Sequence, residues 1–133
     1  MQLSEIKYLG IDIGGAHLKC IGLNKKKEIK LVDYTSYKIW SSSNQLETNL
    51  QNLSNKIRSN ETICGITMSA ELCDIFPNRE NGVKELTKLC KILKFNKSYY
   101  TCSKPIFSLN PKASEIMSMN WHSIGRLCEK KIK

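Results

Sequence analysis

Residues 7–23 hold the feature that most limits what this chain can fold into. An apolar run, Lys7–Ile13, is followed by the pair Gly14-Gly15 and then by a second apolar run, Ala16–Leu23. Two such runs separated by glycines predict two antiparallel strands joined by a tight turn. Asp12 stands where the first strand ends. The segment therefore predicts a β-hairpin whose tip carries a carboxylate and accessible backbone.

The rest of the pattern predicts a third strand over 28–37 and then helices that alternate with strands. An amphipathic helix should run from residue 45 to near residue 60, because large apolar residues recur there at helical spacing. These residues are Leu46, Leu50, Leu53 and Ile57. The remaining predicted elements are a strand over 62–68, a short helical segment over 70–75, a helix capped by Asn78, a strand over 97–102 and a helix over 112–121.

This order, β-β-β-α-β-α-β-α, is typical of an α/β fold. An antiparallel meander followed by strand–helix units predicts a mixed five-stranded sheet with helices on both faces. A dinucleotide-binding fold is disfavoured, because its fingerprint needs a helix directly after the glycines and here a strand follows Gly15. The length of 133 residues suits one such domain.

Charge and cysteine usage disfavour several classes of protein. The net charge of +9 is spread along the chain and is nearly all lysine, with three arginines, so we expect no specific nucleic-acid partner. No stretch approaches the ~20 apolar residues of a membrane span, and the first residues do not resemble a secretory signal. We therefore expect a cytoplasmic protein with no membrane partner. None of the six cysteines forms a C-x-x-C pair, which favours reduced thiols over a zinc site.

The Asp12-x-Gly14-Gly15 turn allows two interpretations. It can be a plain glycine turn with a capping aspartate. It can also be a phosphate site, because glycine lets a phosphate approach backbone N–H groups directly. A carboxylate beside the turn could then hold Mg²⁺ through water, and Lys19 could add a positive charge.

The segment Asp12–Lys19 resembles the first phosphate-binding motif of the acetate-kinase, sugar-kinase, Hsp70 and actin superfamily, whose lobes begin with the same order of elements. A narrower resemblance is carried by "GIDIGGAHLK", by "GITMSAELCDIFPNRENGV" and by "SEIMSMNWHS". These segments are similar to hydantoinase/oxoprolinase-related proteins of tetrahydromethanopterin-linked one-carbon pathways, which include methanofuran-biosynthesis synthases. The similarity covers about residues 8–122.

This resemblance implies an actin-like, ribonuclease H-like lobe of an enzyme that uses a phosphorylated or diphosphorylated substrate. One branch of the family joins a furan-methyl diphosphate to glutamyl-tyramine and releases diphosphate. The implied ligands are Mg²⁺ held by Asp12, and ATP or a diphosphate. The implied phosphate contacts are Gly14, Gly15, Ala16, His17, Lys19 and Thr67. His17 and Thr67 also suit purely structural positions on strands.

The second block places two carboxylates, Glu71 and Asp74, just after the strand over 62–68. Spaced three apart, they would share one face of a helical turn. Such a catalytic pair could bind a metal ion or act as a general base on a substrate hydroxyl. Alternatively, Ser69 caps a helix and Glu71 lies in its first turn. We expect Asp12 and the glycine backbone to face solvent at one end of the sheet, with Glu71 on the same side.

The chain also departs from the family, whose members are more than twice as long. We expect one lobe over 1–121 and a basic tail over 122–133 that is unlike the family. The second lobe is then missing, so a partner lobe or a homo-oligomer would complete the cleft and the isolated chain would be inactive. Two other readings stay open: a non-catalytic actin-like binding or assembly module, and a fragment of a small-molecule kinase.

Overall fold

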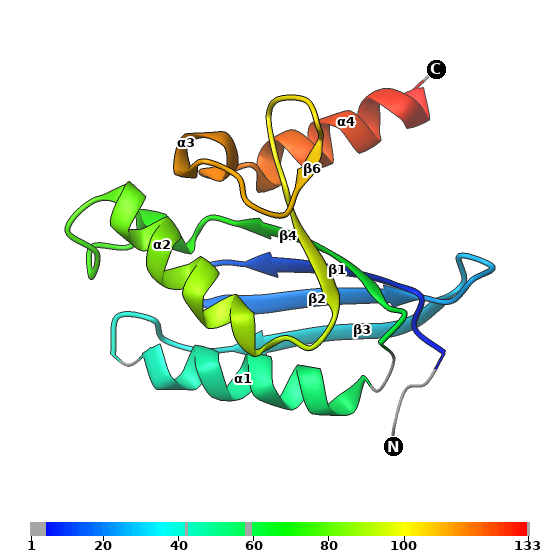
Figure 1. Cartoon of the computed structure of the whole chain (residues 1–133), viewed down its shortest axis with the longest axis horizontal. Helices are drawn as coiled ribbons and strands as arrows, with labels where there is room; N and C mark the ends of the chain where they lie inside the picture. Colours follow the sequence, from blue (N-terminus) through cyan, green and yellow to red (C-terminus); the bar gives the residue numbers. More distant parts are fainter. Residues whose placement is uncertain (1–4, 42, 58–59, 133) are drawn as a thin grey trace.

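The computed structural model describes residues 5–41, 43–57 and 60–132. Its centre is a six-stranded sheet with the strand order β3-β2-β1-β4-β5-β6 (Figure 1). The strands are β1 (Tyr8–Ile13), β2 (His17–Leu23), β3 (Ile29–Ser36), β4 (Ile63–Met68), β5 (Asn96–Tyr100) and β6 (Phe107–Ser108). The helices are α1 (Ser43–Lys56), α2 (Arg79–Leu89), α3 (Ala113–Ile116) and α4 (Asn120–Ile132), with short 3₁₀ turns η1 (Ala70–Leu72) and η2 (Cys90–Ile92).

The sheet is mixed, as the sequence predicts. Strands β1, β2 and β3 form an antiparallel meander, while β4 and β5 run parallel to β1. The carboxyl ends of β1 and β4 therefore lie side by side, with Asp12 opposite Thr67 and Ile13 opposite Met68. This edge is where an open α/β sheet usually carries its site.

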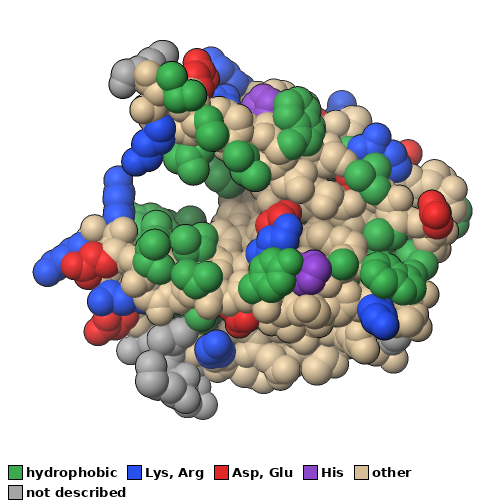
Figure 2. Space-filling view, turned by 180° about the vertical axis from the view of Figure 1, so that it is seen from behind, with side chains coloured by type: hydrophobic (Ala, Val, Ile, Leu, Met, Phe, Trp, Pro, Cys, Tyr) green, Lys and Arg blue, Asp and Glu red, His purple; other side chains and the backbone are tan. Residues whose placement is uncertain are grey.

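The two faces of the sheet differ in how they are covered. Helices α1 and α2 pack on one face (Figure 1). The opposite face, here called the open face, exposes large apolar side chains, and the space-filling view shows a hollow between it and α4 (Figure 2). These side chains are Tyr8, Ile21, Val32, Tyr34, Ile63 and Phe107. A helix does lie on this second side, but α4 has no buried residue and does not cover the face, contrary to our expectation.

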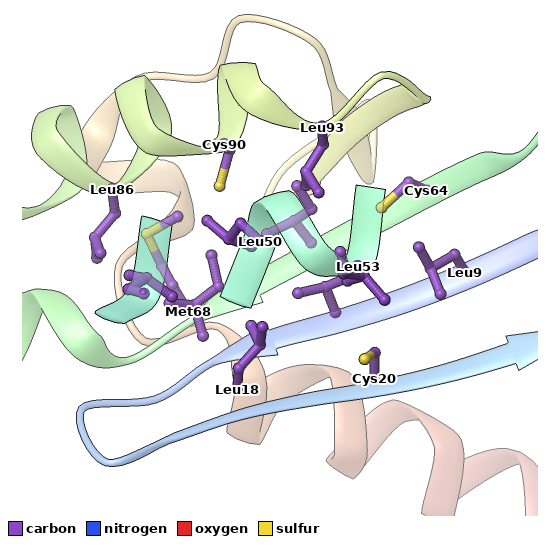
Figure 3. Packing of buried hydrophobic residues seen from close by; sticks show 14 of the residues in the cluster. Leu9, Leu18, Cys20, Leu50, Leu53, Cys64, Met68, Leu86, Cys90 and Leu93 are labelled. Atoms are coloured by element: carbon purple, nitrogen blue, oxygen red, sulfur yellow. The ribbon is translucent and has the colours of Figure 1, made fainter. Parts of the chain in front are cut away.

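The hydrophobic core lies between the sheet and helices α1 and α2 (Figure 3). All four predicted residues of the α1 stripe are buried: Leu46, Leu50, Leu53 and Ile57. Leu86 and Cys90 contribute from α2 and η2, and alternate residues of β1, β2 and β4 face them. Alternation places one half of each strand in this core and the other half on the open face.

Three predicted features need correction. The sheet has six strands rather than five, because the two-residue β6 pairs with β5 through Tyr100 and Phe107. The predicted helix over 112–121 is two helices, since the chain turns sharply at Ser118, whose φ is 51°. The expected tail over 122–133 continues α4 as far as Ile132, and Lys133 lies outside the described residues.

The other boundaries agree closely with the predictions. The end of the helix predicted near residue 60 touches positions 58–59, which lie outside the described residues. Asn78 caps α2 as expected, because its side-chain oxygen accepts a 2.9 Å hydrogen bond from the amide of Asn81. No helix in the described part of the chain is long and apolar enough to span a membrane.

Candidate functional site

The glycine hairpin forms, with a three-residue link between its strands. Asp12 of β1 lies opposite Lys19 of β2. The amide of Gly14 donates a 3.0 Å hydrogen bond to the carbonyl of His17, which closes the turn. No described glycine has a positive φ, so the backbone conformation of the turn does not itself require glycine.

Glycine is needed at the tip of the hairpin because a side chain would not fit there. A β-carbon on Gly15 would lie 2.5 Å from Sγ of Cys73, which follows η1. Gly14 is buried, so our expectation that both glycines face solvent is wrong for Gly14. The chain after β4 packs over the turn and leaves Gly15 only partly exposed. The glycines thus allow other groups to approach the backbone of the turn closely. At Gly15 the side chain of Cys73 already occupies part of that space.

The carbonyls of the hairpin tip are held by the segment that follows β3. The hydroxyl of Tyr37 donates a hydrogen bond to the carbonyl of Gly14. The backbone amide of Tyr37 donates a second one to the carbonyl of Ala16 at 2.9 Å. The amide of Ile39 donates to the carbonyl of Gly15 at 3.4 Å. Burial, with the thiol of Cys73 as the next contribution, raises the pKa of Tyr37 well above its usual value, so the phenol remains a donor.

The amides of the tip have a different status from its carbonyls. Among the residues that the structure describes, neither Gly15 nor Ala16 donates a hydrogen bond from its amide. Consecutive N–H groups held in a fixed turn can form an anion-binding concavity. Two donors of the hairpin are therefore available to an anionic ligand.

Three of the predicted site residues meet at the carboxyl end of β1 and β4. The ammonium group of Lys19 lies 3.0 Å from Oδ2 of Asp12, and the hydroxyl of Thr67 donates to Oδ1 at 3.2 Å. The side chain of Asp12 is 23% exposed and that of Lys19 is 46% exposed. Both carboxylate oxygens are therefore engaged, yet water and small ligands can reach the group.

Ser69 joins this cluster, although sequence reasoning treated it only as a helix cap. Its hydroxyl and the ammonium group of Lys19 each lie 3.9 Å from the position that a β-carbon would take on Gly14. It makes no side-chain cap hydrogen bond to η1. Its amide donates to the carbonyl of Ile13 at 3.0 Å, which ties the start of η1 to the end of β1. An ammonium group and a hydroxyl thus both lie close to Gly14.

Glu71 lies in a separate, buried network. Its side chain is fully buried, and Oε1 accepts a 2.7 Å hydrogen bond from the hydroxyl of Ser118. The guanidinium group of Arg79 lies 3.7 Å from the same oxygen and donates to Ser118 at 3.0 Å. Within the described residues Oε2 has no hydrogen-bond partner. The arrangement joins η1, the start of α2 and the turn between α3 and α4.

Asp74 and His17 do not join either cluster. The 3₁₀ turn η1 ends at Leu72, so Asp74 does not share a helical face with Glu71 as predicted, and it is exposed while Glu71 is buried. The ring of His17 stacks on Tyr34 with 4.5 Å between ring centroids. This contact supports the structural interpretation of His17 on the open face.

A groove runs over the open face and reaches the Asp12 cluster. Its volume is about 780 Å³. Apolar residues of β1, β2, β3, β4 and β6 line most of it, and Ser123 lines it from α4. Asp12, Lys19 and Thr67 line it near the carboxyl ends of β1 and β4, and Asp33, Ser98 and Ser123 add further polar groups. The groove thus combines a long apolar surface with the ion pair of Asp12 and Lys19.

The cluster suits Mg²⁺ only together with a phosphorylated ligand. Among the described residues, no group of three or more His, Cys, Asp or Glu side chains could hold a metal ion. Mg²⁺ usually keeps several waters and binds one or two carboxylates plus substrate phosphates. Asp12 supplies one carboxylate beside a lysine and two free amides, which fits that mode and not an all-protein cage.

Comparison with known proteins adds no assignment to this geometry. The chain matches no protein-family model and no curated protein.

Proposed function

We propose that this chain is the phosphate-binding lobe of an enzyme that uses a phosphorylated or diphosphorylated compound together with Mg²⁺. One observation carries the proposal: the Lys19 ammonium group and the Ser69 hydroxyl both lie close to Gly14, beside the carboxylate of Asp12. A cation, a hydroxyl and two free amides are the donors that phosphate oxygens accept from.

Each group has a defined part in this proposal. The amides of Gly15 and Ala16 donate to phosphate oxygens, and Lys19 turns from Asp12 toward the ligand as a point charge. Asp12, oriented by the hydroxyl of Thr67, would hold the hydrated ion. When bound, Mg²⁺ would offset the negative charge of a leaving diphosphate.

A more specific proposal for the reaction rests on the family resemblance of the segments quoted in the sequence analysis. In this proposal the chain is part of a synthase of one-carbon cofactor biosynthesis that condenses a furan-methyl diphosphate with glutamyl-tyramine. Glu71 and Asp74 would act as bases toward the phenol in that reaction. Because Glu71 is buried, its carboxylate reaches a substrate only if the turn around Ser118 opens. ATP in place of a diphosphate would instead favour a fragment of a small-molecule kinase.

The test is a titration of the ¹⁵N-labelled chain with pyrophosphate, with and without Mg²⁺, followed by amide NMR spectra. We expect the amides of Gly15 and Ala16 to shift only when Mg²⁺ is present. Asp12→Asn should weaken this response by roughly tenfold or more, about 1.4 kcal/mol. Lys25→Met, a change at an exposed lysine outside this cluster, is the matched control and should leave the response unchanged. No shift at the hairpin up to millimolar pyrophosphate, or an unchanged response in Asp12→Asn, would refute the proposal. Repeating the titration with ATP distinguishes the kinase hypothesis, which predicts that ATP and not pyrophosphate shifts these amides.

A second candidate function is favoured by a specific observation, the uncovered apolar open face. Such a face is unusual on a protein that works as a monomer, because large exposed apolar patches mark interaction sites. A non-catalytic binding or assembly module would keep this face and dispense with the phosphate site. It predicts association without any response to Mg²⁺-pyrophosphate.

A further inference from the structure

The molecule carries two large apolar surfaces that no residue described in the structure covers. The first is the open face of the sheet, where Val32 is 72% exposed and Tyr34 61% exposed. The second is one side of α4, where apolar residues recur three apart. These residues are Trp121, Ile124 and Leu127, which are 64%, 61% and 58% exposed. Both surfaces border the hollow seen in the space-filling view (Figure 2).

The described contacts of α4 within the chain do not explain why this helix is stable. It has 13 residues and buries none of them. Isolated helices of this length are marginal in water and depend on packing of an apolar face. The hydroxyl of Tyr100 lies 2.9 Å from Nδ1 of His122, which ties the first turn of α4 to β5. The rest of the helix extends away from this anchor with its apolar residues exposed.

The two surfaces are of two kinds that can pack together. The open face is a groove of about 780 Å³ with an apolar lining, and α4 is a ridge with an apolar stripe. A helix that lays its apolar face in a hydrophobic groove is a common recognition mode. One chain carries both the groove and the ridge. In a dimer with a twofold axis, each groove would therefore receive the helix of the other copy.

The exposed area is large enough for a stable contact. At ordinary side-chain areas of up to about 250 Å², the exposed parts of the open-face residues and the α4 stripe sum to on the order of 900 Å² per copy. A standard interface buries about 800 Å² on each partner. Complete burial of these surfaces would therefore match the area of a specific dimer.

We infer that this protein forms a symmetric dimer in which α4 of each copy lies in the open-face groove of its partner. The two copies carry +9 each, and Arg126, Lys130 and Lys131 of α4 bring positive charge to the contact. Apolar burial drives the association and like charge opposes it, so added salt should strengthen the dimer by screening. This inference does not depend on the proposed phosphate site.

The test uses sedimentation of the full chain with two variants, one on each surface. Ile124→Glu places a charge on the helix stripe, and Val32→Glu places one on the sheet. Both residues are exposed, so neither change removes a core contact. We expect a dimer at tens of micromolar that tightens between 50 and 500 mM NaCl, and at least a tenfold weaker association in each variant. Leu109→Glu, at an apolar residue that is 71% exposed outside the groove, is the matched control and should leave the dimer intact.

Mixing the two variants tests the reciprocal arrangement itself. The Val32→Glu copy keeps an intact helix and the Ile124→Glu copy keeps an intact groove, so one of the two contacts can form. We expect the mixture to associate more tightly than either variant alone. A monomeric protein at 500 mM NaCl would overturn the inference, whether or not the protein binds another partner. Variants that dimerise like Leu109→Glu, or a mixture no tighter than its parts, would overturn it too.

Discussion

The hydroxyl of Ser118 donates a 2.7 Å hydrogen bond to Oε1 of Glu71, a residue 47 positions earlier in the chain. This contact joins η1, which follows the central strand β4, to the turn that precedes α4. Glu71 is 1% exposed, so its carboxylate depends on this hydroxyl and on Arg79 for its polar contacts. The position of the buried carboxylate is therefore linked to the position of α4.

Substitutions at Glu71 should separate the hydrogen bond from the charge. Glu71→Gln keeps an acceptor oxygen for Ser118 and removes a buried charge, so the free energy of unfolding should change by less than about 1 kcal/mol. Glu71→Ala leaves a cavity and removes the acceptor for Ser118, at a cost of about 2–3 kcal/mol. Urea denaturation measures both. Equal destabilisation by the two substitutions would show that the ion pair with Arg79 matters more than the hydrogen bond.

Much of the fold follows from the spacing of apolar residues. Leu46, Leu50 and Leu53 recur at helical spacing and all face the core. The hairpin of β1 and β2 follows from two apolar runs around a glycine pair, and the cap at Asn78 from its residue type. These features are local, so the sequence is enough to predict them.

The features that the sequence does not reveal depend on distant partners. Strand β6 has two residues and exists only because β5 is beside it. The bond between Glu71 and Ser118 spans 47 positions, and neither residue type signals the other. The strands of the meander carry apolar residues on both faces, such as Leu31 on the core side and Val32 on the open face. The order of the elements predicted helices on both sides. The pattern cannot distinguish a face covered by the chain's own helix from one left exposed.

The candidate site likewise contains residues that the sequence could predict and one that it could not. Asp12, Lys19 and Thr67 could be predicted because hairpin pairing and parallel registration place them together. Ser69 was missed as a member of the cluster, since its approach to Gly14 depends on the path of the chain after β4.

Two helical glycines should respond oppositely to alanine. A β-carbon on Gly82 of α2 would lie 2.9 Å from Cα of Glu71, whereas one on Gly125 of α4 would meet nothing within 4 Å. Gly82→Ala should therefore destabilise the protein by about 1–3 kcal/mol through overpacking. Gly125→Ala should stabilise α4 by about 0.5–1 kcal/mol, because alanine is the better helix former. Thermal denaturation of both variants measures this. A destabilised Gly125→Ala would mean that position 125 itself lies against another surface, beside the stripe of Trp121, Ile124 and Leu127.

The cysteines should react with iodoacetamide in an order set by burial. Cys102 and Cys128 are exposed, whereas Cys20, Cys64 and Cys90 are buried and their pKa values are raised to about 12, chiefly by desolvation. Burial and the charges of Asp74 and Glu71 also raise the pKa of the partly exposed Cys73. Because the thiolate is the nucleophile, we expect the exposed pair to react first, then Cys73, and the buried three only on unfolding. Peptide mass spectrometry after timed labelling measures the order, and early labelling of Cys64 or Cys90 would contradict it.

The same buried thiols should make the fold sensitive to alkaline pH. Cys64 and Cys90 have a pKa of about 12 in the folded chain, mainly because of desolvation, and about 8.5 when unfolded. Between these values the folded state binds more protons than the unfolded state, so the free energy of unfolding falls as pH rises. It should be steady up to about pH 8 and then fall by as much as about 1.4 kcal/mol per pH unit for each buried thiol. Urea denaturation from pH 7 to pH 11 measures the slope. Cys64→Ala should make the slope shallower and Cys128→Ala should not, because Cys64 is buried in the folded chain and Cys128 is exposed. Equal slopes in the two variants would show that Cys64 does not contribute to the alkaline loss of stability.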